Sequence, residues 1–177
     1  MKSIKLHDKE FVPYLSADNI ALQIKRVAGE INRDYKNKRP LFIAILNGAF
    51  MFASDLFKEL DIEAEICFIK LASYKGIKSS GQVITSIGLD ADLKNRDIII
   101  IEDIVDTGNT LHQFLPQVAN HQPSSLRIAA LLQKPDALVH PIKVDYFGFS
   151  VPNKFLLGYG LDYDGLGRNI PEIYELV

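Results

Sequence analysis

The sequence predicts an α/β protein with a central parallel sheet flanked by helices. Stretches rich in β-branched residues alternate with stretches of helical spacing, which is the pattern of strand–helix–strand units. Four consecutive isoleucines at 98–101 are typical of a strand buried on both faces of a sheet. The chain has 177 residues, of which 47% are hydrophobic, so we expect one domain over residues 1–177 with a sizeable core.

The local patterns predict each element in turn. Ser16 is a candidate N-cap for a helix that places Ile20, Ile24, Val27 and Ile31 on one stripe. The spacing then predicts a strand at 41–46, a helix at 52–60, strands at 63–70, 83–87 and 98–101, a helix from residue 109, and strands at 126–132, 145–149 and 155–158. Pro116 should kink or end the helix in which it lies.

Composition narrows the classes of partner. The net charge is −2 and no window is dense in Lys and Arg, which argues against nucleic acid. No apolar stretch is long enough to cross a membrane, and no signal peptide is recognisable, so no membrane partner is expected. The single cysteine, Cys67, rules out an internal disulfide framework and fits a buried thiol in a cytoplasmic protein.

The most informative segment is residues 98–110, where the isoleucine run meets a polar loop and the start of a helix. Ligands of open α/β sheets bind at this position, beyond the carboxyl ends of the strands. Thr107, Gly108, Asn109 and Thr110 bring backbone N–H groups to a helix N-terminus, which favours a phosphate. Gly108 also permits a positive-φ turn and a close approach of the ligand.

The adjacent carboxylates Glu102 and Asp103 suit a different part of the same ligand. Carboxylates accept hydrogen bonds from vicinal ribose hydroxyls and are ligands for Mg²⁺. Phosphate donors at one end and carboxylates at the other describe a site for a ribose 5-phosphate. The competing interpretation is an ordinary strand–loop–helix joint with an Asp/Thr cap.

Residues 98–110 resemble the phosphoribosyl-diphosphate (PRPP) binding motif of type I phosphoribosyltransferases. Other segments follow in the order seen in hypoxanthine-guanine phosphoribosyltransferases, namely residues 46–50, Ser73-Tyr74, Lys134-Pro135, residues 154–163 and Arg168. The resemblance covers about residues 40–170. It implies the type I fold, in which terminal segments form a small hood, and homodimers or homotetramers. The implied reaction is Mg²⁺-dependent transfer from PRPP to hypoxanthine, and to guanine, with release of pyrophosphate.

The resemblance also assigns roles around the base. Asp106 corresponds to the carboxylate that faces the purine N7 as general acid/base, although such an Asp can be a simple helix cap. Lys134 corresponds to the donor to O6, where the alternative is a solvated surface lysine. Phe155 corresponds to the aromatic that stacks on the purine, where the alternative is a core position. Leu156 corresponds to a backbone contact with the base edge.

A second set of implied roles concerns pyrophosphate and metal. Asp162 corresponds to the carboxylate beside the base that holds a second Mg²⁺, and Arg168 to a pyrophosphate ligand. Asn47 and Gly48 match a loop that binds pyrophosphate through backbone amides, often across a non-proline cis peptide. Asn47 stands where a lysine is common, so it supplies the amide but no charge. Ser73 and Tyr74 match the lid that closes over the site.

Two alternatives remain open at this point. One is a xanthine-preferring transferase, because the side chains at the purine C2 edge cannot be located from the pattern. The other is an RNA-binding regulator built on the same fold, against which the lack of a basic patch and the presence of Lys134 and Phe155 both argue. The four histidines have no metal-ligand spacing, and we assign them no role.

Overall fold

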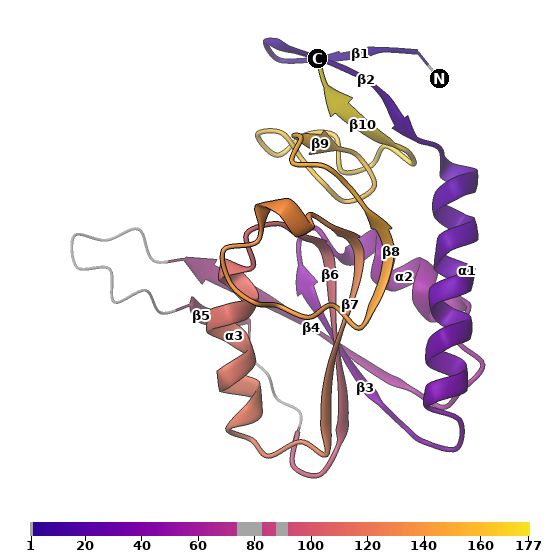
Figure 1. Cartoon of the computed structure of the whole chain (residues 1–177), viewed down its shortest axis with the longest axis vertical. Helices are drawn as coiled ribbons and strands as arrows, with labels where there is room; N and C mark the ends of the chain where they lie inside the picture. The colour runs from indigo at the N-terminus through magenta and orange to yellow at the C-terminus, as the bar shows by residue number, and fades with distance from the viewer. Residues whose placement is uncertain (1, 74–82, 88–91) are drawn as a thin grey trace, which may run out of the picture.

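The computed structural model describes residues 2–73, 83–87 and 92–177 (Figure 1). Its centre is a six-stranded sheet in the order β5-β4-β3-β6-β7-β8. The strands β4, β3, β6, β7 and β8 run parallel, and β5 pairs antiparallel with β4 at one edge. The predicted central parallel sheet is therefore confirmed. The bounds are β3 Leu41–Leu46, β4 Glu65–Ser73, β5 Val83–Ile87, β6 Asp97–Val105, β7 Ser125–Gln133 and β8 Tyr146–Ser150.

Helices cover both faces of this sheet. The helices α1 (Ala17–Asp34) and α2 (Phe50–Lys58) pack in one hydrophobic cluster with Ile99 and Ile101 of β6. The helix α3 (Asn109–Ala119) packs on the other face with Ile98 and Ile100. Alternate residues of β6 thus belong to two different cores, as expected for a strand with both faces buried. A short 3₁₀ turn, Pro135–Ala137, follows β7.

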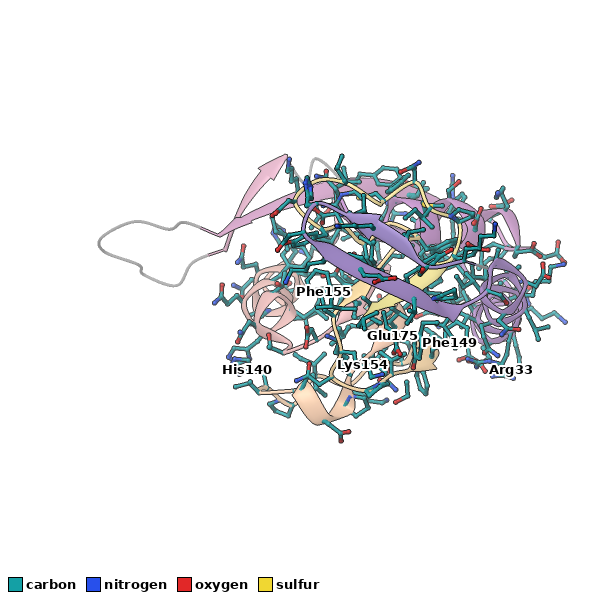
Figure 2. All side chains as sticks on the ribbon, turned by 90° about the horizontal axis from the view of Figure 1, so that it is seen from above. Arg33, His140, Phe149, Lys154, Phe155 and Glu175 are labelled. Atoms are coloured by element: carbon teal, nitrogen blue, oxygen red, sulfur yellow. The ribbon has the colours of Figure 1, made fainter. Side chains whose placement is uncertain are left out.

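A second, four-stranded antiparallel sheet forms the hood. It consists of β1 (Ile4–Leu6), β2 (Lys9–Leu15), β10 (Ile173–Leu176) and β9 (Leu156–Leu157), in that order. Both ends of the chain lie in it (Figure 1), and in the view from above its strands cross over the rest of the molecule (Figure 2). Terminal segments therefore do form the hood. Three buried side chains make its small core, Phe11, Leu157 and Tyr174.

Several element boundaries differ from the predicted ones. The first helix begins as expected, since the Ser16 Oγ accepts a hydrogen bond from the Asn19 N–H at 3.3 Å. The second helix begins at Phe50 rather than at residue 52. Its start was misplaced because no side chain caps the helix, so the sequence carries no start signal. The third continues past Pro116 to Ala119, so the proline does not end it there. The strand predicted at 98–101 extends to residue 105.

Two further observations concern properties expected from composition. Cys67 is half-buried on β4, and burial raises the pKa of its thiol. No helix in the described part of the chain has both the length and the apolar character needed to cross a bilayer. The expectation of a single domain over residues 1–177 stays a prediction.

Candidate active site

The acidic pair predicted at the tip of the central strand lies inside it. Glu102 is still paired with Ala130 of β7, and β6 ends only at Val105. The two side chains interact with each other, and each carboxylate shifts the pKa of the other. Glu102 lines a cavity beside the α3 N-terminus, and Asp103 lines a cavity beside β9.

Burial dominates the electrostatics of this pair. Glu102 is 7% exposed, and burial raises the pKa of its carboxyl well above the usual value, with the Asp103 charge adding to the effect. Burial also raises the pKa of Asp103, although the Ile104 N–H, 2.9 Å from Oδ1, opposes the shift. Two buried neighbouring carboxylates are costly to ionise together unless a cation is near. The donor set therefore fits a hard divalent cation.

The predicted phosphate loop forms a small cavity at the α3 N-terminus. It measures about 80 Å³, and its lining includes Glu102 and residues 106–111. Gly108 has a φ of +78°, and a Cβ there would lie 2.8 Å from the Ile142 side chain, so only glycine fits. The Asn109 N–H contacts the Thr107 Oγ1 at 3.4 Å. The four residues 107–110 are thus brought together around one cavity, as expected from their positions.

A contact that the sequence did not predict fixes the rim of this loop. The Nε2 atom of His140 lies 2.8 Å from the Asn109 Oδ1, and the His140 ring stacks on His112 of α3 at 3.9 Å between centroids. The histidines carried no signal because the contact joins two distant segments and has no regular spacing. His140 therefore orients the Asn109 side chain at the edge of the phosphate loop.

The residues predicted around the base line a second cavity, of about 190 Å³. The Lys134 side chain is only 7% exposed, and its Nζ lies 3.0 Å from the Asp106 Oδ2. The alternative of a solvated surface lysine is wrong. Phe155 is 45% exposed, so it is not a core residue and offers a ring to a ligand, whereas Leu156 is buried. The set that lines the cavity is Asp103, Ile104, Asp106, Lys134, Phe155, Leu156, Leu161 and Asp162.

Two loops pack together beside Asp103. The peptide bond between Leu46 and Asn47 is cis. A Cβ on Gly48 would lie 1.6 Å from the Asp103 Oδ2, and a Cβ on Gly160 would lie 2.1 Å from the Gly48 carbonyl oxygen. Both glycines are required because a carboxylate and a backbone, respectively, occupy the space of a side chain. The close packing of Gly160 on Gly48 was not predicted from the sequence.

Asp162 and Arg168 are paired with each other. The Arg168 Nη2 lies 2.6 Å from the Asp162 Oδ1, and its Nη1 donates to the Gly160 carbonyl at 2.6 Å. The second Asp162 oxygen accepts a hydrogen bond from the Gly165 N–H at 2.7 Å. Both residues lie at the edge of the site, and the Arg168 charge acts to lower the pKa of Asp103 against the larger effect of burial.

The predicted metal ligands do not form one cluster. Among the residues that the structure describes, no group of three or more His, Cys, Asp or Glu side chains could hold a metal ion. Glu102 and Asp103 stay together, while Asp162 is bound to Arg168. Mg²⁺ commonly takes one or two carboxylates from a protein and the rest of its ligands from substrate phosphates and water. The pair on β6 fits such an open site.

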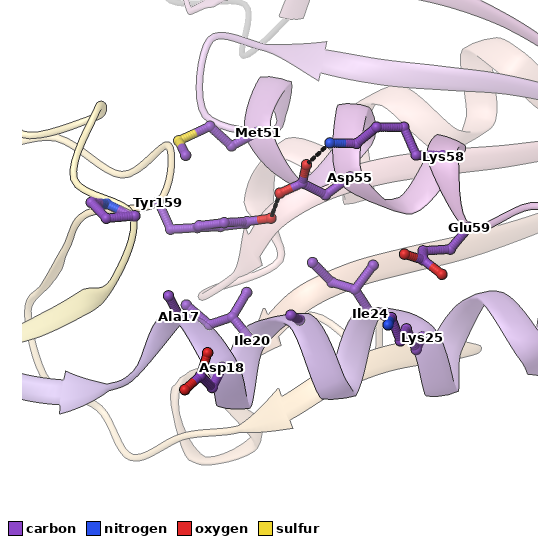
Figure 3. Close-up of a pocket in the computed structure, with 12 residues that line it drawn as sticks. Ala17, Asp18, Ile20, Ile24, Lys25, Met51, Asp55, Lys58, Glu59 and Tyr159 are labelled. Carbon is purple, nitrogen blue, oxygen red and sulfur yellow. Dashed lines mark hydrogen bonds and ion pairs between the residues drawn. The ribbon is translucent and has the colours of Figure 1, made fainter.

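Two remaining features lie outside this site. Ser73 is the last residue of β4, and Tyr74 lies outside the described residues. A cavity of about 470 Å³ between α1 and α2 is lined by Met51 and Asp55 (Figure 3). The Tyr159 hydroxyl donates to Asp55, which also meets the Lys58 Nζ at 2.6 Å (Figure 3). These contacts pair the charges of Asp55 and Lys58 within the protein.

Comparison with known proteins agrees with this geometry. Residues 13–164 match the model of the phosphoribosyl transferase domain. The chain is 39% identical to the hypoxanthine-guanine phosphoribosyltransferase of Lactococcus lactis, over 94% of this chain and 91% of that protein. It is 36% identical to the hypoxanthine-guanine-xanthine phosphoribosyltransferase of Tritrichomonas foetus, over 95% and 92%. The crystal structure of a hypoxanthine phosphoribosyltransferase from Staphylococcus aureus matches with a TM-score of 0.89 and 36% identity, covering 94% of this chain and 91% of that one.

Proposed function

The chain belongs to the phosphoribosyltransferase family, and we propose that it is a purine-salvage enzyme that joins hypoxanthine, and guanine, to PRPP. The products are IMP or GMP and pyrophosphate. The choice of base rests on the Lys134–Asp106 ion pair, in which the lysine side chain is buried. This pair lines the same cavity as the half-exposed ring of Phe155. A flat apolar surface beside a donor and a carboxylate suits a 6-oxopurine.

The PRPP molecule spans the two cavities at the end of β6. Its 5-phosphate lies in the cavity of residues 107–110, where backbone N–H groups and the α3 dipole favour an anion. The ribose hydroxyls then lie over Glu102 and Asp103, which line the two cavities. The pyrophosphate lies toward Asn47, Gly48 and Arg168. Asn47 contributes an N–H without a charge, so Arg168 is the cation that we assign to this group.

The base binds between Phe155 and Lys134. The Phe155 ring stacks on the purine, the backbone at Leu156 meets its edge, and the Lys134 ammonium donates to O6. A lysine ammonium has three donors and no acceptor, so it can keep Asp106 while it binds the base. Adenine presents donors at the same position and is excluded.

Asp106 acts on the proton that the purine loses. As the base nitrogen attacks C1′, the imidazole ring of the purine becomes more acidic, and the Asp106 carboxylate accepts or stabilises its proton at N7. A nearby carboxylate also stabilises the cationic, oxocarbenium-like sugar as the bond to pyrophosphate breaks. The hydrogen bond from Lys134 holds the Asp106 oxygen in place until the base arrives.

We propose Mg²⁺ as the metal. Glu102 and Asp103 are the residues of this chain that would hold it, directly or through the ribose hydroxyls, with Asp162 as the third candidate. When bound, Mg²⁺ neutralises pyrophosphate charge as that group leaves.

We further propose a cytoplasmic location, a homodimer or homotetramer, and a lid that includes Ser73 and Tyr74. The one half-buried cysteine is compatible with a reducing compartment.

The test is an assay of purified protein with PRPP, Mg²⁺ and each of hypoxanthine, guanine, xanthine, adenine and uracil, following nucleotide formation and pyrophosphate release. We expect IMP and GMP, and no turnover in excess EDTA. Preferred use of xanthine would replace the base assignment, and full activity in EDTA would remove the metal. No product with any base, together with RNA binding in a gel-shift assay, would favour the regulator instead.

A further inference from the structure

Strand β10 of the hood holds the backbone at Phe155, the residue that we propose stacks on the purine. Leu176 of β10 donates its N–H to the Phe155 carbonyl at 3.0 Å, and the adjacent Lys154 pairs with Glu175 at 2.8 Å. Figure 2 shows Lys154 and Glu175 beside Phe155 in the view from above. Phe155 directly precedes β9, and its backbone is held by β10, while 45% of the residue stays exposed.

Two aromatic side chains fix the Phe155 ring itself. Tyr163 meets it edge-to-face with centroids 5.8 Å apart, and Phe11 of β2 meets it at 6.2 Å. Tyr163 and Phe11 also contact each other at 6.0 Å, so the three rings form a closed cluster. Edge-to-face contacts of this kind prefer one orientation over others. The orientation of Tyr163 therefore sets the orientation of Phe155.

The turn between β1 and β2 in turn fixes Tyr163. The Tyr163 hydroxyl donates to the Asp8 Oδ1 at 2.8 Å, the His7 ring packs edge-on at 5.6 Å, and the Lys9 Nζ lies 5.4 Å from the ring centroid. The hydrogen bond lowers the pKa of Asp8 and raises the pKa of Tyr163 to about 12. Three consecutive residues, His7 and Asp8 of the turn and Lys9 at the start of β2, thus contact one ring.

We propose that Tyr163 and Asp8 are positioning residues for the purine, which hold Phe155 in the orientation that stacks on the base. This inference rests on the proposed function. The β1–β2 turn is in this way part of the base-recognition apparatus, although Asp8 does not line the base cavity. Neither residue touches the phosphate cavity, so the effect is confined to the base.

The experiment is steady-state kinetics on five variants and the wild type, with hypoxanthine and PRPP varied separately. Tyr163→Phe removes the hydroxyl and keeps the ring, Asp8→Ala removes the acceptor, and the double variant removes both. Asp8→Asn keeps an acceptor and serves as the conservative rescue. Tyr174→Phe is the matched control, because its hydroxyl also donates to a carboxylate of the hood, Glu172 at 3.1 Å, whereas the aromatic rings packed on Phe155 are those of Phe11 and Tyr163.

Tyr163→Phe and Asp8→Ala should each raise the KM for hypoxanthine about three- to tenfold, the scale of one ordinary lost hydrogen bond, because the Tyr163–Asp8 contact is exposed to solvent. We expect kcat and the KM for PRPP to stay within about twofold. The double variant should match the single ones, since both remove one interaction. Asp8→Asn and Tyr174→Phe should behave as wild type.

An unchanged KM for hypoxanthine in both single variants would overturn the inference, as would additive effects in the double variant. A change confined to the KM for PRPP would show that Tyr163 acts through its neighbour Asp162 rather than through Phe155, and it would equally overturn the inference. Thermal unfolding midpoints check that each variant is folded. An inactive wild-type enzyme would count against the proposed function, whereas these outcomes require an active one, so the two failures are distinguishable.

Discussion

Replacing Lys134 with Gln is the sharpest test of the base site. The lysine is 6% exposed, and its Nζ lies 3.0 Å from the Asp106 Oδ2, so one of its three donors is used within the protein and others can reach a ligand. Adenine would bring N–H groups against this ammonium. A site built around one hydrogen bond rejects such an analogue by about 10⁴–10⁵-fold, which is the ratio of kcat/KM that we expect between hypoxanthine and adenine in the wild type.

The magnitude for the variant follows from the bond that is lost. A hydrogen bond to a charged group contributes about 1.5–3 kcal/mol, and about 1.4 kcal/mol corresponds to a tenfold change in rate. Lys134→Gln should therefore lower kcat/KM for hypoxanthine roughly 10- to 150-fold. An amide can both donate and accept, so the activity on adenine should rise and the gap between the two bases should narrow.

The assay measures IMP and AMP formation at saturating PRPP and Mg²⁺. Lys143→Gln is the matched control: Lys143 also pairs with a carboxylate, Asp145 at 3.1 Å, but its side chain is 86% exposed and lies outside the base cavity. It should be indistinguishable from wild type. Comparable kcat/KM values for adenine and hypoxanthine in the wild type, or equal effects of the two substitutions, would refute the role of Lys134.

Three further predictions concern the other parts of the site. Asp106→Asn keeps an acceptor for Lys134, but the amide is a far weaker base than the carboxylate. In the PRPP assay, kcat should therefore fall roughly 10²–10⁴-fold without loss of fold. Activity within a few-fold of wild type would remove Asp106 from the mechanism. Burial raises the pKa of Glu102 well above its usual value of 4.5, because the folded protein favours the protonated carboxyl. The stability that the protonated form contributes is therefore fully present below pH 4.5 and is lost as the pH rises. Glu102→Gln should therefore unfold at a higher temperature than wild type at neutral pH without divalent metal, and the difference should vanish toward pH 4.5; a gain independent of pH would contradict this reasoning. Gly48→Ala places a Cβ 1.6 Å from the Asp103 Oδ2, and by displacing that carboxylate it should lower kcat/KM for PRPP about 10²-fold. The control is Gly29→Ala, which should leave the kinetics unchanged because a Cβ there meets open space.

The parts of the fold that depend on neighbouring residues were predictable. The N-cap Ser16 marks the start of α1, and the apolar stripe that follows it marks the buried face of that helix. The isoleucine run marks the interior of β6. The phosphate loop is equally local, because its residues follow the strand directly. The start of α2 was misplaced by two residues, since Ala49 has no side chain that caps the helix.

Features that join distant segments were not predictable from spacing. Lys134 ends a strand and could have been solvated; it is buried because Asp106, on the neighbouring strand's loop, lies within reach. The His140–Asn109 contact likewise joins two segments that no periodicity connects. The burial of Glu102 within the sheet was visible only once β6 was known to continue to Val105.

The pairing of β2 with β10 has a consequence for the order in which the molecule assembles. Phe11 lies opposite Leu176, so this pairing closes a loop that includes nearly every other element, and closing long loops costs chain entropy and slows folding. The central sheet instead forms from neighbouring segments, such as β6 with β7. During synthesis, the strands that hold Phe155 can pair only after β10 has left the ribosome. We therefore expect the cavity of residues 107–110 to form before Phe155 is held in place, and until β10 pairs, the edge of β2 is open to pairing with another chain.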